Sequence, residues 1–427
     1  MGKRLSIPSG TADVFGARAR RRQHVLEIIR RVYEMFGFEP LFTPTLEHAI
    51  VFHGHHGEGE KLLFNLRDKN DVPLVLRYDL TVPLARVVNM YPNIPRPFKR
   101  YQIATSFRDD EVDHGHFREF TQCDGDVIGV SDLSADAEVI CMAHLGLKSI
   151  GFKSFIIRIN HRGIMKGIAE YACGPNYDVL EIQRALDFAD KSIKQGIAGV
   201  KTDLLRRGIP KSAVEKFIPI LNFKGNTFNK LDFIKKELEN YPDAQKGITE
   251  LQIIINLLPE EVQNNISVDL TLARGADYYT GFILEGVIPG IPVGAVLGGG
   301  RYDNLISATG GGNEPATGMA FGLERILTVM EEMSIMTDEN NQTILAYSSN
   351  SGKKDAFLAT HHLRNSGIMV DFNPQISVFS EAIEYAKKRN YSAILICGDN
   401  RNFSVKPVAE NALAIIERIG DELSKIN

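Results

Sequence analysis

Residues 107–129 read FRDDEVDHGHFREFTQCDGDVIG and predict the loop and second strand of a β-hairpin. Before them, residues 100–108 alternate between apolar and polar side chains, which is the period of a strand. An acidic loop follows, and the alternation resumes at Phe117 in an aromatic and β-branched run. One face of this second strand carries four polar side chains, Arg118, Gln122, Asp124 and Asp126. Such a face is too polar for a core, so it either meets solvent or surrounds a charged ligand.

Five segments resemble four signature motifs of class II aminoacyl-tRNA synthetases, in the form found in histidyl-tRNA synthetases. Residues 107–111 and 115–122 resemble motif 2. Residues 274–279, RGADYY, and 299–303, GGRYD, resemble the two histidine-specific signatures, and residues 317–325, TGMAFGLER, resemble motif 3. The resemblance implies an α+β catalytic domain built on an antiparallel sheet flanked by helices, with a helical insertion and a small C-terminal α/β domain similar to anticodon-binding domains.

Length and composition set broader limits. A chain of 427 residues predicts two or three domains, and the net charge of -4 gives no global attraction to nucleic acid, so any RNA contact must come from local patches. The four cysteines have no paired spacing, which argues against a zinc ribbon or a disulfide framework and suggests a reducing, cytoplasmic location. No run of about 18 apolar residues occurs, so we expect no membrane span.

The N-terminal part predicts a helix and an edge strand. Apolar residues recur at helical spacing between Ala17 and Phe36, and Gly37 ends the pattern. Residues 38–47 contain Pro40 and Pro44 and predict a strand that is not central in a sheet. In the family this helix and strand form motif 1, the dimer interface, so the resemblance implies a homodimer.

Residues 53–56, HGHH, with two nearby glutamates, suggest a metal site. The glycines in this segment indicate a flexible loop, and no cysteine supports the histidines as ligands. We therefore predict that the protein has no metal ligands of its own here.

Residues 74–78 predict a buried strand that runs into a helix. Thr81 is placed to cap the N-terminus of that helix, and Pro83 suits its first turn. The carboxylate of Asp79 matches the positive end of the helix dipole. The resemblance adds that Asp79 and Thr81 hold the α-amino group of the amino acid substrate.

The middle of the chain predicts a helical segment between strands. Residues 154–159 predict a strand, and residues 161–265 predict helices separated by glycine, proline and asparagine breaks. Apolar residues occupy every second position from Val268, which predicts a strand with these residues on its inward face. Continuing the alternation places Arg274 on the same face, where a buried cation needs an anionic partner. Residues 279–287 start another strand, and the glycine run before Arg301 suits a close approach of backbone to ligand.

Residues 333–342 form a polar linker, beyond which three short strands alternate with three amphipathic helices. This pattern predicts a small α/β unit, whose last part, residues 399–427, is a loop and a helix. We expect the following domains: a catalytic domain at 1–160 and 266–332, a helical insertion at 161–265, and an anticodon-binding domain at 343–427.

The resemblance also assigns roles to single residues. It implies that Arg108, Arg274 and Arg325 are catalytic cations at the phosphates of ATP, helped by His116 and Arg118 in binding ATP, and that Mg²⁺ accompanies ATP. It implies that the histidine substrate is bound by the following residues: Asp79, Thr81, Gln122, Asp126, Arg274, Tyr278, Tyr279 and Tyr302. The implied activity is histidine–tRNA ligation, with L-histidine, ATP and tRNA(His) as partners.

Two other functions share this fold. A regulatory subunit of ATP phosphoribosyltransferase senses histidine without catalysis, but it typically lacks the first-signature arginine and the C-terminal domain, whereas Arg274 and residues 343–427 are present here. A class II synthetase for another amino acid would leave Asp126, Tyr278 and Tyr279 without a purpose. The synthetase for histidine therefore explains more of the sequence than either alternative.

Overall fold

The computed structural model describes most of the chain, in two compact units. The first unit contains residues 1–13 and 22–335, and the second contains residues 14–21 and 336–427. The described segments are 5–53, 57–112, 117–174, 201–202, 204–206, 208–272, 278–335, 343–348, 352–398, 402–409 and 412–425. The domain limits given above remain predictions.

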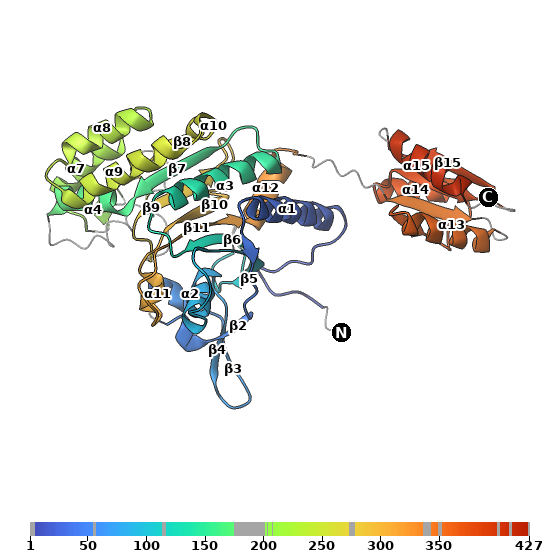
Figure 1. The fold of residues 1–427 in the computed structure, drawn as a ribbon, viewed down its shortest axis with the longest axis horizontal. Coiled ribbons are helices and arrows are strands. Elements are labelled where there is room, and N and C mark those ends of the chain that lie inside the picture. Colours follow the sequence, from blue (N-terminus) through green and yellow to red (C-terminus); the bar gives the residue numbers. More distant parts are fainter. Residues whose placement is uncertain are drawn as a thin grey trace. The chain divides into compact units, whose positions relative to one another are not determined.

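The first unit is built on an eight-stranded sheet with the order β1-β5-β6-β11-β10-β9-β7-β8 (Figure 1). All neighbouring strands are antiparallel except the two edge pairs, β1 with β5 and β7 with β8. The predicted hairpin and the predicted antiparallel α+β fold are thus confirmed. The strands are β1 (Glu39–Pro40), β5 (Phe98–Phe107), β6 (Glu119–Ile128), β7 (Ile156–His161), β8 (Ile266–Val268), β9 (Phe282–Val287), β10 (Leu297–Arg301) and β11 (Ala316–Gly322).

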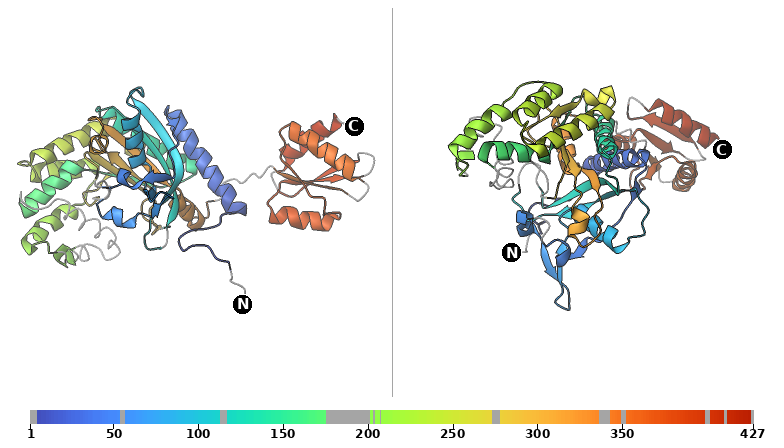
Figure 2. Two further views of the ribbon diagram at one scale, coloured as in Figure 1. Left: turned by 90° about the horizontal axis from the view of Figure 1, so that it is seen from below. Right: turned by 60° about the vertical axis from the view of Figure 1, so that its left-hand side comes forward.

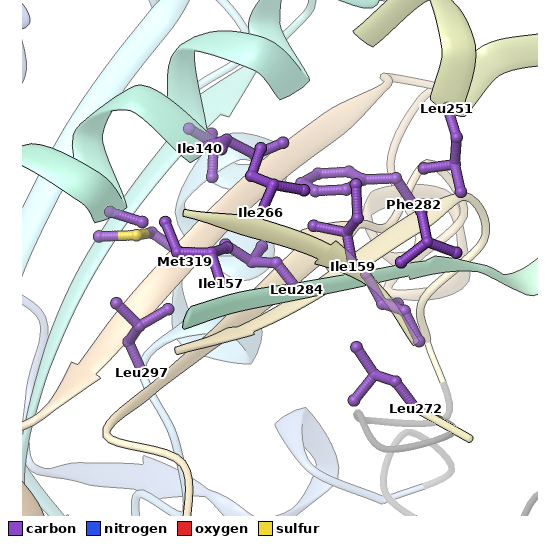
Figure 3. Close-up of a cluster of buried hydrophobic side chains, with 14 of the residues drawn as sticks. Ile140, Ile157, Ile159, Leu251, Ile266, Leu272, Phe282, Leu284, Leu297 and Met319 are labelled. Atoms are coloured by element: carbon purple, nitrogen blue, oxygen red, sulfur yellow. The ribbon is translucent and has the colours of Figure 1, made fainter. Parts of the chain in front are cut away.

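One face of this sheet is apolar and lies under helices. The covering helices are α1 (Gly16–Met35), α3 (Ser134–Ile150) and α12 (Leu323–Glu332). Figure 3 shows Ile140 of α3 beside Ile157, Leu284 and Met319 of the strands. Gly146 lies so close to the ring of Phe321 that a Cβ would overlap it, so α3 packs tightly on the sheet. The helix α12 packs on the sheet through a stripe of buried residues, Leu323, Ile326, Leu327 and Met330.

The opposite face is polar and is closed at one end by a second core. This core contains α2 (Thr81–Met90), α11 (Leu305–Ala308) and the small sheet β2-β4-β3, formed by β2 (Leu46–His48), β3 (Asn65–Arg67) and β4 (Pro73–Leu76). The short helices η1 (Ala49–Val51) and η2 (Gly57–Leu62) connect its strands. Within β4 only Val75 is buried, so the strand predicted as buried is half exposed.

The single strand predicted for residues 38–47 is wrong. The chain forms β1 at the edge of the large sheet and then β2 in the small sheet. The edge position agrees with the two prolines, but Pro44 has no N–H to continue a ladder, and the chain leaves the large sheet before it.

Helices occupy the described part of the predicted insertion, as expected. They are α4 (Arg162–Cys173), α7 (Lys211–Leu221), α8 (Thr227–Glu237), α9 (Pro242–Leu257) and α10 (Glu260–Gln263). Figure 2 shows these helices together beyond the end of the large sheet. His161 joins them to the sheet, because its Nδ1 accepts a hydrogen bond from the N–H of Gly163 and its Nε2 lies 2.8 Å from Glu250 of α9.

The parity argument that led to Arg274 is also wrong, because β8 ends at Val268. Asp269 starts a turn in which its carboxylate accepts hydrogen bonds from the N–H and hydroxyl of Thr271. Aspartate favours such turns because its side chain competes for nearby backbone donors. Arg274 itself lies outside the described residues.

The second unit is an α/β sheet with the order β13-β12-β14-β15. It contains β12 (Ile344–Ser348), α13 (Lys353–Asn365), β13 (Val370–Phe372), α14 (Phe379–Lys388), β14 (Ala393–Cys397), β15 (Phe403–Pro407) and α15 (Leu413–Ser424). The strand β15 replaces the predicted loop. Its Ser404 and Lys406 are exposed at the sheet edge, so its sequence lacks the apolar pattern of a buried strand. Within the described segments of both units, no helix is long and apolar enough to cross a membrane.

Candidate active site

The polar face of the large sheet gathers charged groups over small residues. The strand register places Gln102 of β5, Asp124 of β6 and Ala320 of β11 side by side. One step along, Arg100, Asp126 and Gly318 form the next row. The four polar or charged members of these rows are all buried, so this face does not meet bulk solvent. The ligand alternative therefore fits this face.

Asp126 is held from two sides. The guanidinium of Arg100, which is fully buried, lies 2.7 Å from Oδ2 in an ion pair, and the hydroxyl of Tyr302 donates a hydrogen bond to Oδ1. Arg100 also donates to the carbonyl of Leu80 at 3.2 Å. Burial raises the pKa of Asp126, and the charge of Arg100 opposes that rise. The carboxylate is thus fixed in orientation before any ligand arrives.

Gly318 makes room for this carboxylate. A Cβ at residue 318 would overlap Asp126 Oδ1, which is therefore in contact with bare backbone. We expect Gly318→Ala to destabilise the protein by about 1 to 3 kcal/mol through overpacking, as measured by thermal unfolding. Gly312→Ala is the control, because a Cβ there meets nothing within 4 Å. Equal stability of the two variants would contradict the crowding seen at Asp126.

Three tyrosines line the end of this face. The ring centres of Tyr278 and Tyr279 are 5.1 Å apart, and those of Tyr278 and Tyr302 are 5.6 Å apart. Burial raises the pKa of all three phenols, so they remain neutral hydrogen-bonding groups. Tyr278 shares a hydrogen bond with Thr81, which joins the tyrosine cluster to α2.

The start of α2 differs from the expected cap. Thr81 is the first residue of the helix, and the carboxylate of Asp79 accepts a hydrogen bond of 3.0 Å from the N–H of Val82. The predicted Thr81 cap is therefore wrong, whereas the predicted match of Asp79 to the helix end is confirmed. A carboxylate is the better partner because it also interacts with the helix dipole.

Arg108 is clamped between two aromatic rings. Its guanidinium carbon lies 4.2 Å from the ring centre of Tyr78 and 4.9 Å from that of Phe120. Its Nε donates to the carbonyl of Tyr78 at 3.4 Å. A guanidinium stacks well on ring faces and keeps its planar donors in one direction, so the cation is preorganised.

Arg118 and Arg325 have different surroundings. The predicted place of Arg118 on the second strand is wrong, because β6 begins at Glu119. Its side chain instead turns to the acidic loop, 3.3 Å from Asp109 and 3.1 Å from the carbonyl of Asp110. Arg325 lies in the first turn of α12 and donates to the carbonyl of Ala295 at 2.9 Å.

The structure brings most of the predicted site residues to one unit, and two lie outside the described residues. Arg274 and His116 are those two. Gln122 stands on the same face as Asp124 and Asp126. Sequence reasoning missed the roles of Arg100 and Glu324. The alternation of residues 100–108 places Arg100 on the polar face of its strand, and this position could have indicated its role. Glu324 accepts hydrogen bonds from Thr121 at 2.9 Å and from Arg22 at 2.8 Å, and no sequence pattern indicated it.

An antiparallel sheet with helices on one face, a charged face on the other, and a glycine-rich strand entering α12 defines the catalytic fold of class II aminoacyl-tRNA synthetases. A model of the family described as histidyl-tRNA synthetase matches residues 10–326. The chain belongs to the histidyl-tRNA synthetase family, as the sequence motifs predicted.

Relatives match over nearly the whole chain. The histidine–tRNA ligase of Christiangramia forsetii is 33% identical, over 95% of this chain and 96% of its own length. That of Cytophaga hutchinsonii is 34% identical, over 92% of each chain. The crystal structure of histidyl-tRNA synthetase from Nostoc sp. PCC 7120 is similar with a TM-score of 0.81 and 25% identity, over 98% of this chain and 100% of that one.

One structure bears on the alternative function. A crystal structure described as an ATP phosphoribosyltransferase regulatory subunit/histidyl-tRNA synthetase from Bacillus halodurans has a TM-score of 0.75 at 22% identity. It covers 93% of this chain and 100% of its own. At that identity the likeness concerns the fold alone, so it does not favour a regulatory role.

Proposed function

We propose that the protein activates L-histidine with ATP to histidyl-adenylate and transfers the histidyl group to the 3′ end of tRNA(His). The observation that carries this proposal is the buried carboxylate of Asp126, oriented by Arg100 and Tyr302 above the bare backbone of Gly318. A fixed acceptor beside phenol groups suits an imidazole ring, which presents two nitrogens with different hydrogen-bonding roles.

The activation step needs fixed cations more than a nucleophilic side chain. The histidine carboxylate attacks the α-phosphorus of ATP, pyrophosphate leaves, and negative charge builds on the non-bridging oxygens. Each preorganised donor at such oxygens contributes about 2.7 to 4 kcal/mol to transition-state stabilisation. We assign Arg108 to the α-phosphate, Arg274 beside it, and Arg325 to the γ-phosphate, with His116 and Arg118 supporting ATP.

We propose that Mg²⁺ binds together with ATP. The described residues contain no group of three His, Cys, Asp or Glu side chains suited to a metal ion. Mg²⁺ commonly keeps several waters and binds substrate phosphates rather than an all-protein cage, so MgATP is the form that fits. The ion neutralises phosphate charge when it is bound.

Selection of histidine follows from hydrogen bonds to both ends of the substrate. We assign the ring nitrogens to Asp126 and Tyr279, with Tyr278 and Tyr302 around them, and the α-amino group to Asp79, Thr81 and Gln122. A site built to hydrogen-bond a substrate group rejects analogues without it by roughly 10⁴- to 10⁵-fold.

The test is ATP–pyrophosphate exchange with each of the protein amino acids in turn. We expect exchange with histidine alone, followed by charging of tRNA(His) when it is added. A regulatory subunit would bind histidine without any exchange, and a synthetase of other specificity would exchange with a different amino acid. Either result would overturn the proposal.

We also propose that the enzyme is a cytoplasmic homodimer. Large apolar side chains are exposed in the segment that follows β1: Phe42 is 86% exposed and Ile50 is 76% exposed. A second copy covering this segment would bury them, since exposed apolar patches commonly mark interfaces. All four cysteines are free, which suits a reducing compartment.

We expect the double variant Phe42→Asp, Ile50→Asp to sediment as a monomer, because two buried carboxylates would oppose association. The matched control is Phe228→Asp on α8, where a phenylalanine is also exposed but lies in another part of the unit. The control should keep the mass of the parent protein. A double variant that remains dimeric would place the interface elsewhere.

A further inference from the structure

Asp124 is a buried carboxylate to which no role has been given so far. It stands on β6 between Gln122 and Asp126, on the same polar face as both. Its cross-strand neighbours are Gln102 of β5 and Ala320 of β11. Only 3% of its surface is exposed, so bulk water does not solvate this side chain well. The small side chain of Ala320 leaves space above the sheet at this row.

One oxygen of this carboxylate lacks a hydrogen-bond donor. Among the described residues, Oδ1 of Asp124 has no hydrogen-bond partner, and neither does Oε1 of the facing Gln102, whose amide instead donates to Thr43 at 2.9 Å. Two residues that are paired across neighbouring strands thus each keep one buried acceptor oxygen without a donor from the described part of the chain. Burying an acceptor without a donor is costly, so the arrangement calls for N–H groups from elsewhere.

The charges around Asp124 also favour a ligand that brings N–H donors to this row. Burial raises the pKa of Asp124 well above its usual range, Asp126 and Asp79 add to the rise, and Arg100 and, more weakly, Arg108 oppose it. Arg100 is already engaged in the ion pair with Asp126, and Asp79 accepts the backbone N–H at the start of α2. A cation at the centre of the face, between the residues assigned to the two ends of the substrate, would therefore favour the ionised form of Asp124.

We propose that Asp124 adds a further contact to the α-ammonium group of the substrate, beside Asp79, Thr81 and Gln122, and serves with Asp79 as its counter-ion. This inference rests on the proposed function, since it takes the substrate to be L-histidine. An α-ammonium brings one positive charge and three N–H donors to a row of the sheet that offers unpaired acceptors. The substrate then lies along β6, with its ring at Asp126 and its ammonium over Asp124, toward Gln122. Specificity for an α-amino acid follows from this contact.

The experiment compares two ligands on two proteins. L-histidine and 3-(imidazol-4-yl)propionate differ by the α-ammonium group, and the full-length protein and its Asp124→Asn variant differ by the carboxylate charge. Affinities are measured by isothermal titration calorimetry without ATP. We expect the variant to lose about 10- to 100-fold in affinity for histidine, the range for a hydrogen bond to a charged group. The affinity for the propionate should stay within about three-fold, so that the preference for histidine collapses.

The outcomes separate three situations. If the parent protein binds no histidine, the proposed function fails. If it binds histidine but both ligands weaken alike in Asp124→Asn, then Asp124 serves a protein cation such as Arg100, whose Nε and Nη1 also lack hydrogen-bond partners among the described residues, and this inference alone is refuted. If Asp124→Asn does not fold, Asp124→Glu keeps the charge and should keep the preference for histidine over the propionate. Equal affinities for the two ligands in that variant would refute the inference.

A matched control uses another buried aspartate that is paired with arginine. Asp136 of α3 is fully buried and lies 2.8 Å from Arg301. Asp136→Asn removes the same charge from the same unit, outside the polar row of β6. It should lower the thermal stability without changing the ratio of the two ligand affinities. A changed ratio in Asp136→Asn would show that any lost buried charge produces the effect, and would overturn the assignment.

Discussion

Replacing Arg108 by alanine is expected to slow histidine-dependent ATP–pyrophosphate exchange about 100- to 1000-fold, the range for loss of one preorganised donor at a developing oxyanion. The guanidinium is held between Tyr78 and Phe120, so its direction is set before ATP binds. Because its contact is proposed to strengthen in the transition state, the loss should fall mainly on kcat. Arg108→Lys should be nearly as slow, since an ammonium cannot fill a planar slot between rings.

The control for this prediction is Lys99 of β5, the strand that ends just before Arg108. Its ammonium lies 5.7 Å from the ring centre of Phe38 and 2.7 Å from Glu138, so it is also a cation beside an aromatic ring. Lys99→Ala should leave exchange within about two-fold, as expected for a partly exposed ion pair. Near-normal exchange in Arg108→Ala would remove Arg108 from the proposed chemistry.

Replacing Arg100 by methionine is expected to destabilise the catalytic unit by about 3 to 5 kcal/mol at pH 7, because a buried carboxylate would be left without its cation. Arg100 is fully buried and Asp126 nearly so, which makes this pair unlike the surface ion pairs of the protein. Urea unfolding at fixed pH measures the change. Arg67→Met is the control, since the side chain of Arg67 is 61% exposed in its pair with Asp71 and should contribute at most about 1 kcal/mol.

The pH dependence of Arg100→Met gives a further check on the same pair. Burial raises the folded-state pKa of Asp126 and of Asp124, and Arg100 counteracts this in both cases. Without Arg100 both pKa values rise further above the unfolded value of about 3.9, so the folded state binds protons more tightly than the unfolded state. Stability of the variant should therefore increase as the pH is lowered from 7 through these raised values. A loss of stability that is independent of pH would contradict the assigned ion pair.

The sequence predicts the hairpin of β5 and β6 well because period-2 alternation is a local signal. Alternation tells which side chains share a face, but not which residue of another strand lies opposite. Arg100 and Asp126 have matching parities, yet only the register of the two strands makes them partners. Gly318 is far from Asp126 in the sequence, and no pattern in the residues around Gly318 indicates that a larger side chain there would overlap the carboxylate of Asp126.

The failed predictions share a physical cause. The alternation of residues 38–47 and of residues 268–274 is real, but a short polar or proline-containing step lets the chain leave one sheet in the first case and turn at Asp269 in the second. The edge strand β15 was missed for a different reason. Its exposed positions carry serine and lysine, so the strand forms without the apolar pattern by which strands are predicted. Local patterns thus fail where tertiary contacts decide whether a strand continues.

The space above β11 has a consequence for how the amino acid specificity of this enzyme could change. That space exists because Gly318 and Ala320 carry almost nothing on the side facing Asp126 and Asp124. A methyl group added at Gly318 would narrow this space, whereas a glycine has no side-chain atoms left to remove. Mutation at Gly318 can therefore only exclude molecules, and admission of a bulkier amino acid would have to come from loss of the Ala320 methyl group or from changes among the tyrosines.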